Sequence, residues 1–455
     1  MGNQTKKTPI KKQAVLLIHG IGEQRPMDTL RNFVRAVWTE ATSLHRDGKD
    51  ANKHWSKPYL LSESLELRRL TTPANKAGIR TDFFELYWAH LMHGSTLSHV
   101  ASWARTLLLR RPGAVPRQLR LAYWTIILLL VVGVFFAYEA VAATNPFLSK
   151  WQSTVLSVVV VPIIAGVLTN TVGDAARYLN PSPTNVGRRE EIRQLGVDVL
   201  RSLNDPKNGY DRVVVVGHSL GSVIGYDILY YTWTQMNQKQ HDDASDMEKL
   251  EMLEETTRAL VDGKAVDVDE FQKQQRDYHD ELRNNGNDWR VTDFVTLGSP
   301  LAHAAILLAQ DQDDLNDKIR SRELASCPPE LETSLHKPPK RLFSYPANAE
   351  QRTPHHAALY GPTRWANLYF PARFLVWGDI VGGPLRAVFG NGIKDRAVSI
   401  KRRGGFLSHT LYWSPNGKGS YNSTHLKELR DALDLLCNKS NAPREHGVAS
   451  ENGAE

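Results

Sequence analysis

Short apolar runs that end at glycine, proline or polar residues recur along the chain and predict the strands of a buried sheet. The clearest is a row of four valines, whose branched side chains favour extended backbone. Each run is too short to be a helix of ordinary length. The predicted strands are residues 14–18, 81–88, 213–216, 291–297 and 365–370.

Apolar residues spaced three or four positions apart predict helices over residues 28–42 and 190–203. Residues 234–290 differ from both patterns, because they are rich in charged side chains and contain no strand-like run. Two interpretations of this charged insertion stay open: a lid over a binding site, and a solvated excursion that is helical or loose.

Residues 121–143 form a nearly unbroken apolar stretch in which Glu139 is the only charge. As a helix this stretch would be roughly 35 Å long, enough to cross a hydrocarbon layer of about 30 Å. Tyr123, Trp124 and Tyr138 lie near its ends, where interfacial aromatic residues are expected. A second apolar stretch, 151–170, is rich in β-branched residues and is consistent with a spanning helix, a re-entrant segment or a strand.

The chain has 455 residues and a formal net charge of +7, which favours an anionic partner. No nucleic-acid-binding module is recognisable, so we expect a membrane surface and no nucleic acid. Cys327 and Cys437 are too few for a disulfide framework or a cysteine-based metal site, and they fit a reducing compartment. The polar N-terminus has no secretory signal core, and Lys6 stands where a myristoylation signal has Ser or Thr.

The row of valines leads directly into Gly217-His218-Ser219-Leu220-Gly221, which has the Gly-x-Ser-x-Gly spacing. Because a predicted strand precedes this motif and helical spacing follows it, the motif predicts a nucleophile elbow. In such an elbow Ser219 occupies a strained turn and projects its hydroxyl from the sheet. The glycines are needed because side chains there would collide with the neighbouring strand and helix.

A second glycine turn, which begins with His19 and Gly20, follows the first predicted strand. Small residues at this place let a backbone N–H point at a developing negative charge. We therefore predict an oxyanion hole formed by Leu220, which follows the nucleophile, and by the turn of Gly20 and Ile21. The alternative is an ordinary glycine turn after a strand.

A serine nucleophile needs a base, and the base needs an orienting carboxylate. Asp379 follows the last predicted strand and is the expected acid, with Asp395 as the alternative. His409 follows Asp379 by 30 residues, in a glycine-bearing loop, and is the expected base. His425 begins a helical stretch and His446 lies in the polar tail, so neither is as well placed.

These motifs resemble those of the α/β-hydrolase superfamily, and most closely its lipase-like serine esterases. Two further segments, 296–300 and 365–369, contribute to the resemblance, which covers about half of the chain. The resemblance implies an α/β fold with an eight-stranded, mostly parallel sheet covered by helices on both faces. It also implies cleavage of an ester or thioester through an acyl-enzyme, without a metal or an organic cofactor.

The order of the segments constrains how the chain meets a membrane. Gly20 precedes the apolar stretches and Ser219 follows them, so the chain must cross the bilayer an even number of times, or not at all, to form one site. We therefore predict an inserted hairpin of two transmembrane helices, 121–143 and 151–170. Arginines flank the hairpin and only Lys150 lies in its loop, which places the catalytic body on the cytoplasmic side.

The predicted function is that of a membrane-anchored serine hydrolase acting on a lipid or an acylated substrate. An acyltransferase with the same triad and a catalytically inactive membrane scaffold of this fold are the alternatives. The predicted organisation is a basic leader (1–12), the first part of a hydrolase domain (13–89), a membrane-associated insertion (90–185), the rest of the hydrolase domain (186–437) and a disordered tail (438–455).

Overall fold

The structure is a computed structural model. It describes residues 11–20, 25–48, 50–59, 67–92, 183–238, 247–335, 337–349, 351–372, 378–379, 381–400 and 406–437, and the single positions 124, 127, 131, 132, 135, 138, 151, 152 and 178. Most of the two predicted spanning helices, the first ten residues of the leader and the predicted tail lie outside the described residues. Within the described residues, no helix combines the length and the apolar composition needed to cross a bilayer.

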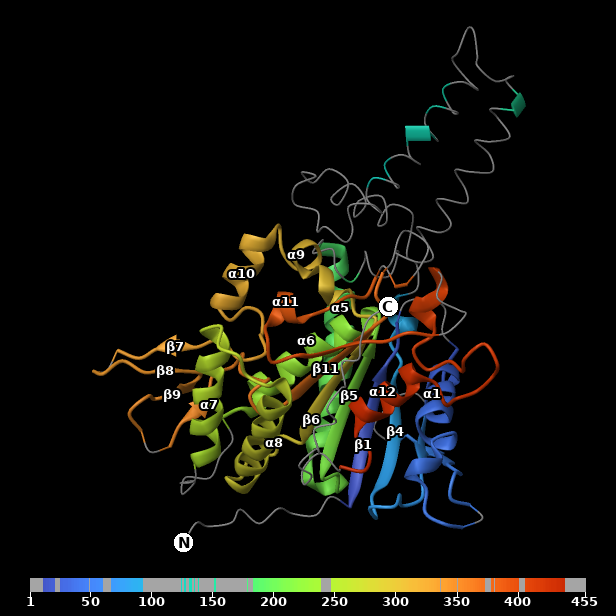
Figure 1. Ribbon diagram of the computed structural model, residues 1–455, viewed down its shortest axis with the longest axis horizontal. Helices are drawn as coiled ribbons and strands as arrows, with labels where there is room; N and C mark the ends of the chain where they lie inside the picture. The colour runs from blue at the N-terminus through green and yellow to red at the C-terminus, as the bar shows by residue number, and fades with distance from the viewer. Residues whose placement is uncertain are drawn as a thin grey trace, which may run out of the picture.

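An eight-stranded sheet runs through the middle of the molecule (Figure 1). The strands from β12 to β4 pair in parallel, whereas β3 and β2 form an antiparallel edge. Their order across the sheet is β12 (Lys394–Ala397), β11 (Arg364–Tyr369), β6 (Val291–Leu297), β5 (Arg212–His218), β1 (Lys12–Ile18), β4 (Arg80–Leu86), β3 (Arg68–Thr71) and β2 (Trp55–Pro58). Two small hairpins pair β7 (Glu332–Thr333) with β8 (Arg341–Leu342), and β9 (Ser344–Tyr345) with β10 (Thr353–Pro354).

The five predicted strands are confirmed as β1, β4, β5, β6 and β11. Every residue of β5 and β6 is buried, as expected for central parallel strands that are covered on both faces. The edge strand β2 was not predicted, because all four of its residues are exposed and no apolar run marks it.

Helices cover both faces of the sheet, as the side chains of β4 make clear. Phe83 packs against Phe33 of α1 (Asp28–Val34), with ring centroids 6.4 Å apart. Leu86, three residues further on, faces Gly196 of α5 (Pro183–Asn204): a Cβ added to Gly196 would lie 3.3 Å from Cδ2 of Leu86. Successive side chains of a strand point to opposite faces, so α1 and α5 lie on opposite sides. The molecule is therefore an α/β fold with a mostly parallel sheet, as predicted.

One predicted helix changes its hydrogen-bonding pattern along its length. The predicted helix over 28–42 changes to a π-helical turn (Arg35–Thr39), and Arg430 of α12 donates hydrogen bonds to the carbonyl of Ala36 in that turn. The α-helices whose bounds the described residues give are α1 (Asp28–Val34), α5 (Pro183–Asn204), α6 (Leu220–Met236), α7 (Glu248–Val261), α8 (Val268–Asn284), α9 (Ala304–Leu307), α10 (Gln312–Arg320), α11 (Arg386–Phe389) and α12 (Thr424–Leu433).

The charged insertion contributes to the core of the molecule. Its described residues include α7 and α8, and α8 buries an amphipathic face against the chain around β11. Gln272 donates a 3.0 Å hydrogen bond to the carbonyl of Trp365, and Gln275 donates to the carbonyls of Tyr360 and Thr363. Many charged side chains of these helices are exposed, but Glu254, Arg276 and Glu281 are buried within the packed faces.

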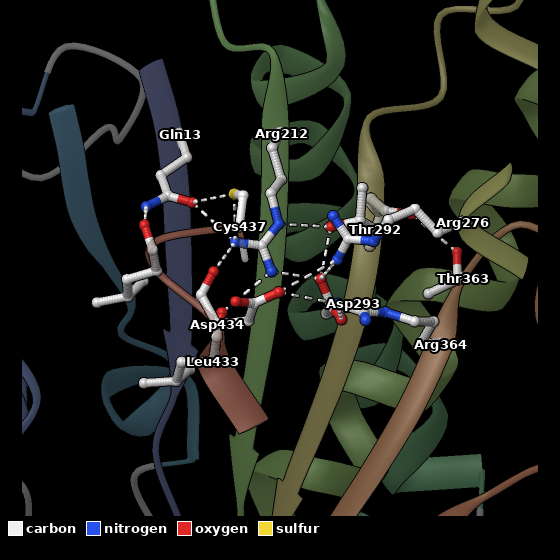
Figure 2. A network of polar contacts seen from close by, with 12 residues as sticks. Gln13, Arg212, Arg276, Thr292, Asp293, Thr363, Arg364, Leu433, Asp434 and Cys437 are labelled. Atoms are coloured by element: carbon white, nitrogen blue, oxygen red, sulfur yellow. Dashed lines mark hydrogen bonds and ion pairs between the residues drawn. The ribbon is translucent and has the colours of Figure 1, made fainter. Parts of the chain in front are cut away.

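A buried ion-pair cluster joins the start of β5 to the C-terminal end of the described chain. Arg212, which is fully buried, lies between Gln13 and Cys437 on one side and Asp293 on the other (Figure 2). It donates to Asp293 at 2.5 Å and to the carbonyls of Leu433 and Asp434 at 3.0 and 2.9 Å. Burying a guanidinium requires this number of acceptors, so the end of α12 is fixed to the sheet.

Candidate active site

Ser219 occupies a sharp turn between β5 and α6. Its backbone has φ 52° and ψ −129°, a region that residues other than glycine rarely adopt. The turn is held by hydrogen bonds from the Ser219 N–H to the carbonyl of Leu297, at 3.0 Å, and from Ser222 to the carbonyl of Ser219. A strained residue that is held by its surroundings in this way is typical of a functional position.

The two motif glycines allow the close contacts that the sequence predicts. A Cβ on Gly217 would lie 2.5 Å from the Cα of Ser222 in the following helix. A Cβ on Gly221 would lie 2.2 Å from the carbonyl oxygen of Ile18 in β1. Larger residues would therefore push α6 away from the sheet and move Ser219 with it.

The predicted oxyanion turn lies against the nucleophile. A Cβ on Gly20 would be 2.8 Å from the Cβ of Ser219, so the backbone at Gly20 directly adjoins the serine side chain. Leu220 is the first residue of α6 and is buried beside it. Ile21, the other predicted contributor, lies outside the described residues.

His409 lies in a short 3₁₀ helix, η7 (Phe406–Thr410), and contacts both Ser219 and Asp379. Its Nε2 atom is 2.8 Å from Oγ of Ser219, and its Nδ1 atom is 2.9 Å from Oδ2 of Asp379. The structure therefore brings together the predicted serine, histidine and aspartate, which are up to 190 residues apart in the chain.

The surroundings of Asp379 keep its carboxylate ionised. Burial alone would raise its pKa, but hydrogen bonds from His409, Gly382 and Tyr412 lower the pKa to about 2. Oδ1 accepts from the backbone N–H groups of Val381 and Gly382, at 2.8 and 3.1 Å. An ionised carboxylate only accepts hydrogen bonds, so Nδ1 of His409 carries a proton and its Nε2 is free to accept from the serine hydroxyl.

Tyr412 is a part of the site that the sequence pattern did not single out. Its hydroxyl donates a 2.8 Å hydrogen bond to Oδ2 of Asp379, the oxygen that His409 also contacts. Gly298, after β6, adjoins the same oxygen: with φ 56°, a Cβ there would lie 2.7 Å from it. The sequence offers one indirect signal for the contact between Tyr412 and Asp379: Tyr412 follows the predicted base, His409, by three residues.

The alternative acid has a different role in the structure. Asp395 accepts hydrogen bonds from Asn367 at 2.7 Å and from the backbone of Leu385 and Arg386 at 3.0 and 2.9 Å. It thereby holds the start of α11 against β11, and Asp379 is the carboxylate beside His409. His425 contacts the carbonyl of Ser414, and His446 lies outside the described residues.

A buried carboxyl group lies at the start of α1. Oε2 of Glu85, in β4, accepts a 3.0 Å hydrogen bond from the N–H of Met27, whose backbone is left-handed with φ 72°. The other oxygen, Oε1, meets no hydrogen-bond donor among the described residues. Burial raises the pKa of Glu85 to about 7, although the Met27 N–H favours the charged form.

Among the described residues, no group of three or more histidine, cysteine, aspartate or glutamate side chains is arranged to hold a metal ion. Comparisons of the chain with protein-family models, with curated proteins and with solved structures find no match. The chemistry of the site is therefore argued from its own geometry: a serine hydroxyl, an imidazole and an ionised carboxylate joined by hydrogen bonds.

The raised pKa of Glu85 predicts that the protein loses stability as the pH rises. An unfolded glutamate ionises near pH 4.5, whereas Glu85 in the fold stays protonated until about pH 7. Stability from this group is therefore complete below pH 4.5 and is lost as the pH rises to 7, by about 3 kcal/mol. Glu85→Gln removes this loss. The free energy of unfolding of the variant should therefore rise relative to that of wild type between pH 4.5 and 7.

Urea unfolding at pH 4.5, 6 and 8, followed by tryptophan fluorescence, measures this difference. Glu191→Gln, which changes an exposed glutamate of α5, is the control and should run parallel to wild type. A Glu85→Gln curve that also runs parallel to wild type contradicts the prediction.

Proposed function

We propose that this protein is a serine hydrolase that cleaves carboxylic esters through an acyl-enzyme on Ser219. The observation that carries the proposal is the continuous row of hydrogen bonds from Asp379 through His409 to Ser219, at 2.9 and 2.8 Å. A base held by a carboxylate and in contact with a hydroxyl is the arrangement that activates a serine nucleophile.

In the proposed reaction, Nε2 of His409 takes the proton of Ser219 while Oγ attacks the ester carbonyl. Asp379 stabilises the resulting imidazolium without taking its proton. The tetrahedral oxyanion accepts hydrogen bonds from the N–H of Leu220 and from the Gly20–Ile21 turn, and loss of one such donor typically costs about 3–4 kcal/mol. His409 then protonates the leaving alcohol and activates the water that releases the acid.

We further propose that the fold is that of the α/β-hydrolase superfamily, with the lipase-like serine esterases as the most similar group. Three observations support this assignment: the mostly parallel sheet, the sharp strand-to-helix turn at Ser219, and the chain order serine, aspartate, histidine.

The described positions of the inserted region support a membrane location. Trp124, Val131, Phe135 and Tyr138 are helical, recur at the spacing of one helix face and are 46–59% exposed, and Trp151 is 68% exposed. Large apolar side chains gathered in this way are unfavourable in water and favourable in lipid. We therefore propose that the insertion is a membrane-embedded hairpin.

The contact between Gly20 and Ser219 limits the topology of this hairpin. These residues precede and follow the apolar stretches, and their backbones adjoin each other. In the proposed topology the chain therefore crosses the bilayer an even number of times, as two spans. The catalytic body lies on the cytoplasmic side. A site at this surface would act on a lipid or an acylated substrate from the inner leaflet.

A fluorophosphonate probe, which phosphonylates activated serines, tests the proposed chemistry. The detergent-solubilised wild type should be labelled on Ser219, and Ser219→Ala should abolish the label. Asp379→Asn leaves the imidazole without its orienting anion and should slow labelling by about 10⁴-fold. The control Ser321→Ala, which changes an exposed serine, should label as wild type does. A folded wild type that takes up no probe overturns the proposal.

Extraction of membranes from expressing cells tests the proposed location. The protein should stay with the membrane pellet in alkaline carbonate and in high salt, and detergent should release it, because apolar helices buried in lipid are held without ion pairs. With two spans, protease should reach both chain ends from the same side of the bilayer. Release by carbonate, or ends on opposite sides, contradicts the membrane proposal.

A further inference from the structure

His218 is the residue before the nucleophile, and neither the strand nor the turn requires an imidazole at this position. The residue is 9% exposed, and its ring lies in an aromatic cluster. The ring centroids of His409, Tyr412 and Trp413 are 5.1, 5.7 and 4.8 Å from that of His218. His218 therefore packs against the segment that carries the proposed base.

One hydrogen bond fixes the tautomer of this imidazole. Nε2 of His218 is 2.8 Å from the backbone carbonyl oxygen of His409. A carbonyl only accepts, so Nε2 is the protonated nitrogen of the neutral ring. Burial, together with the neighbouring His409, lowers the pKa of His218 to about 3, so the ring is neutral at physiological pH and places no charge beside the base.

The other side of the ring faces the oxyanion turn. A Cβ on Gly20 would lie 3.2 Å from Nδ1 of His218 and 2.8 Å from the Cβ of Ser219. The imidazole of His218 thus lies between Gly20 and the backbone of His409, while its own backbone continues into Ser219. All three parts of the proposed mechanism thus adjoin this one residue.

We propose that His218 is a positioning residue of the hydrolase site. His218 holds the backbone carbonyl of His409, and Ser219 is the next residue after His218. The hydrogen bond therefore fixes the distance between the base and the nucleophile. Asp379 holds the imidazole of His409 itself, through Nδ1. This inference rests on the proposed function, since positioning matters only if His409 acts on Ser219.

Two substitutions separate the hydrogen bond from the packing of the ring. His218→Phe keeps an aromatic ring but has no N–H, whereas His218→Gln has an amide N–H that reaches about as far as Nε2. Misplacement of a reacting group by about 1 Å costs about 10²-fold in rate. We expect His218→Phe to lose about 10²-fold in kcat for a short soluble ester with KM little changed, and His218→Gln to recover most of that loss.

The same variants are labelled with the fluorophosphonate, and their melting temperatures are compared. His218→Met, which also lacks the donor, replaces the phenylalanine variant should that variant not fold. Wild-type kcat in the donorless variant, or an equal loss in the donorless and glutamine variants, overturns the role of the hydrogen bond. If wild type and Ser219→Ala both fail to react, the proposed function itself is wrong. If wild type reacts, Ser219→Ala does not, and His218→Phe reacts as fast as wild type, only the positioning role of His218 is wrong.

Discussion

The site depends on how closely the turn after β5 approaches the end of β1. This approach is a backbone contact: a single carbon added to Gly221 would lie 2.2 Å from the carbonyl oxygen of Ile18, and one added to Gly20 would meet Ser219. Only glycines permit it, and it places Ser219, whose φ is 52°, beside the turn at Gly20. The remaining groups are arranged around a nucleophile whose position is set in this way.

Charge in the site is concentrated on one group. Asp379 is buried, ionised and surrounded by donors, whereas burial keeps His19 and His218 neutral by lowering their pKa values to about 4 and about 3. The single carboxylate faces Nδ1 of His409. A positive charge that develops on that imidazole is therefore stabilised by the nearest anion and is not opposed by other charged histidines.

The sequence predicted the parts of the fold that local patterns encode. Apolar runs marked the central strands, and the motif around Ser219 marked the turn. Chain order pointed to Asp379 and His409 but left Asp395 open. Only three-dimensional contacts distinguish Asp379, which follows β11, from Asp395, which lies within β12. The cluster around Arg212 could not be predicted, since its acceptors come from segments 81 and more than 200 residues away. Exposed strands such as β2 carry no apolar signal.

The central claim is that Ser219 carries the acyl group during turnover. Rapid mixing of the detergent-solubilised protein with excess p-nitrophenyl butyrate, acid quenching and mass analysis of the Ser219 peptide measure this directly. The proposed mechanism predicts an initial burst of about one equivalent of nitrophenol and a butyryl group on Ser219. Nitrophenol release with no acyl group on that peptide, or a folded protein that releases none, would contradict it.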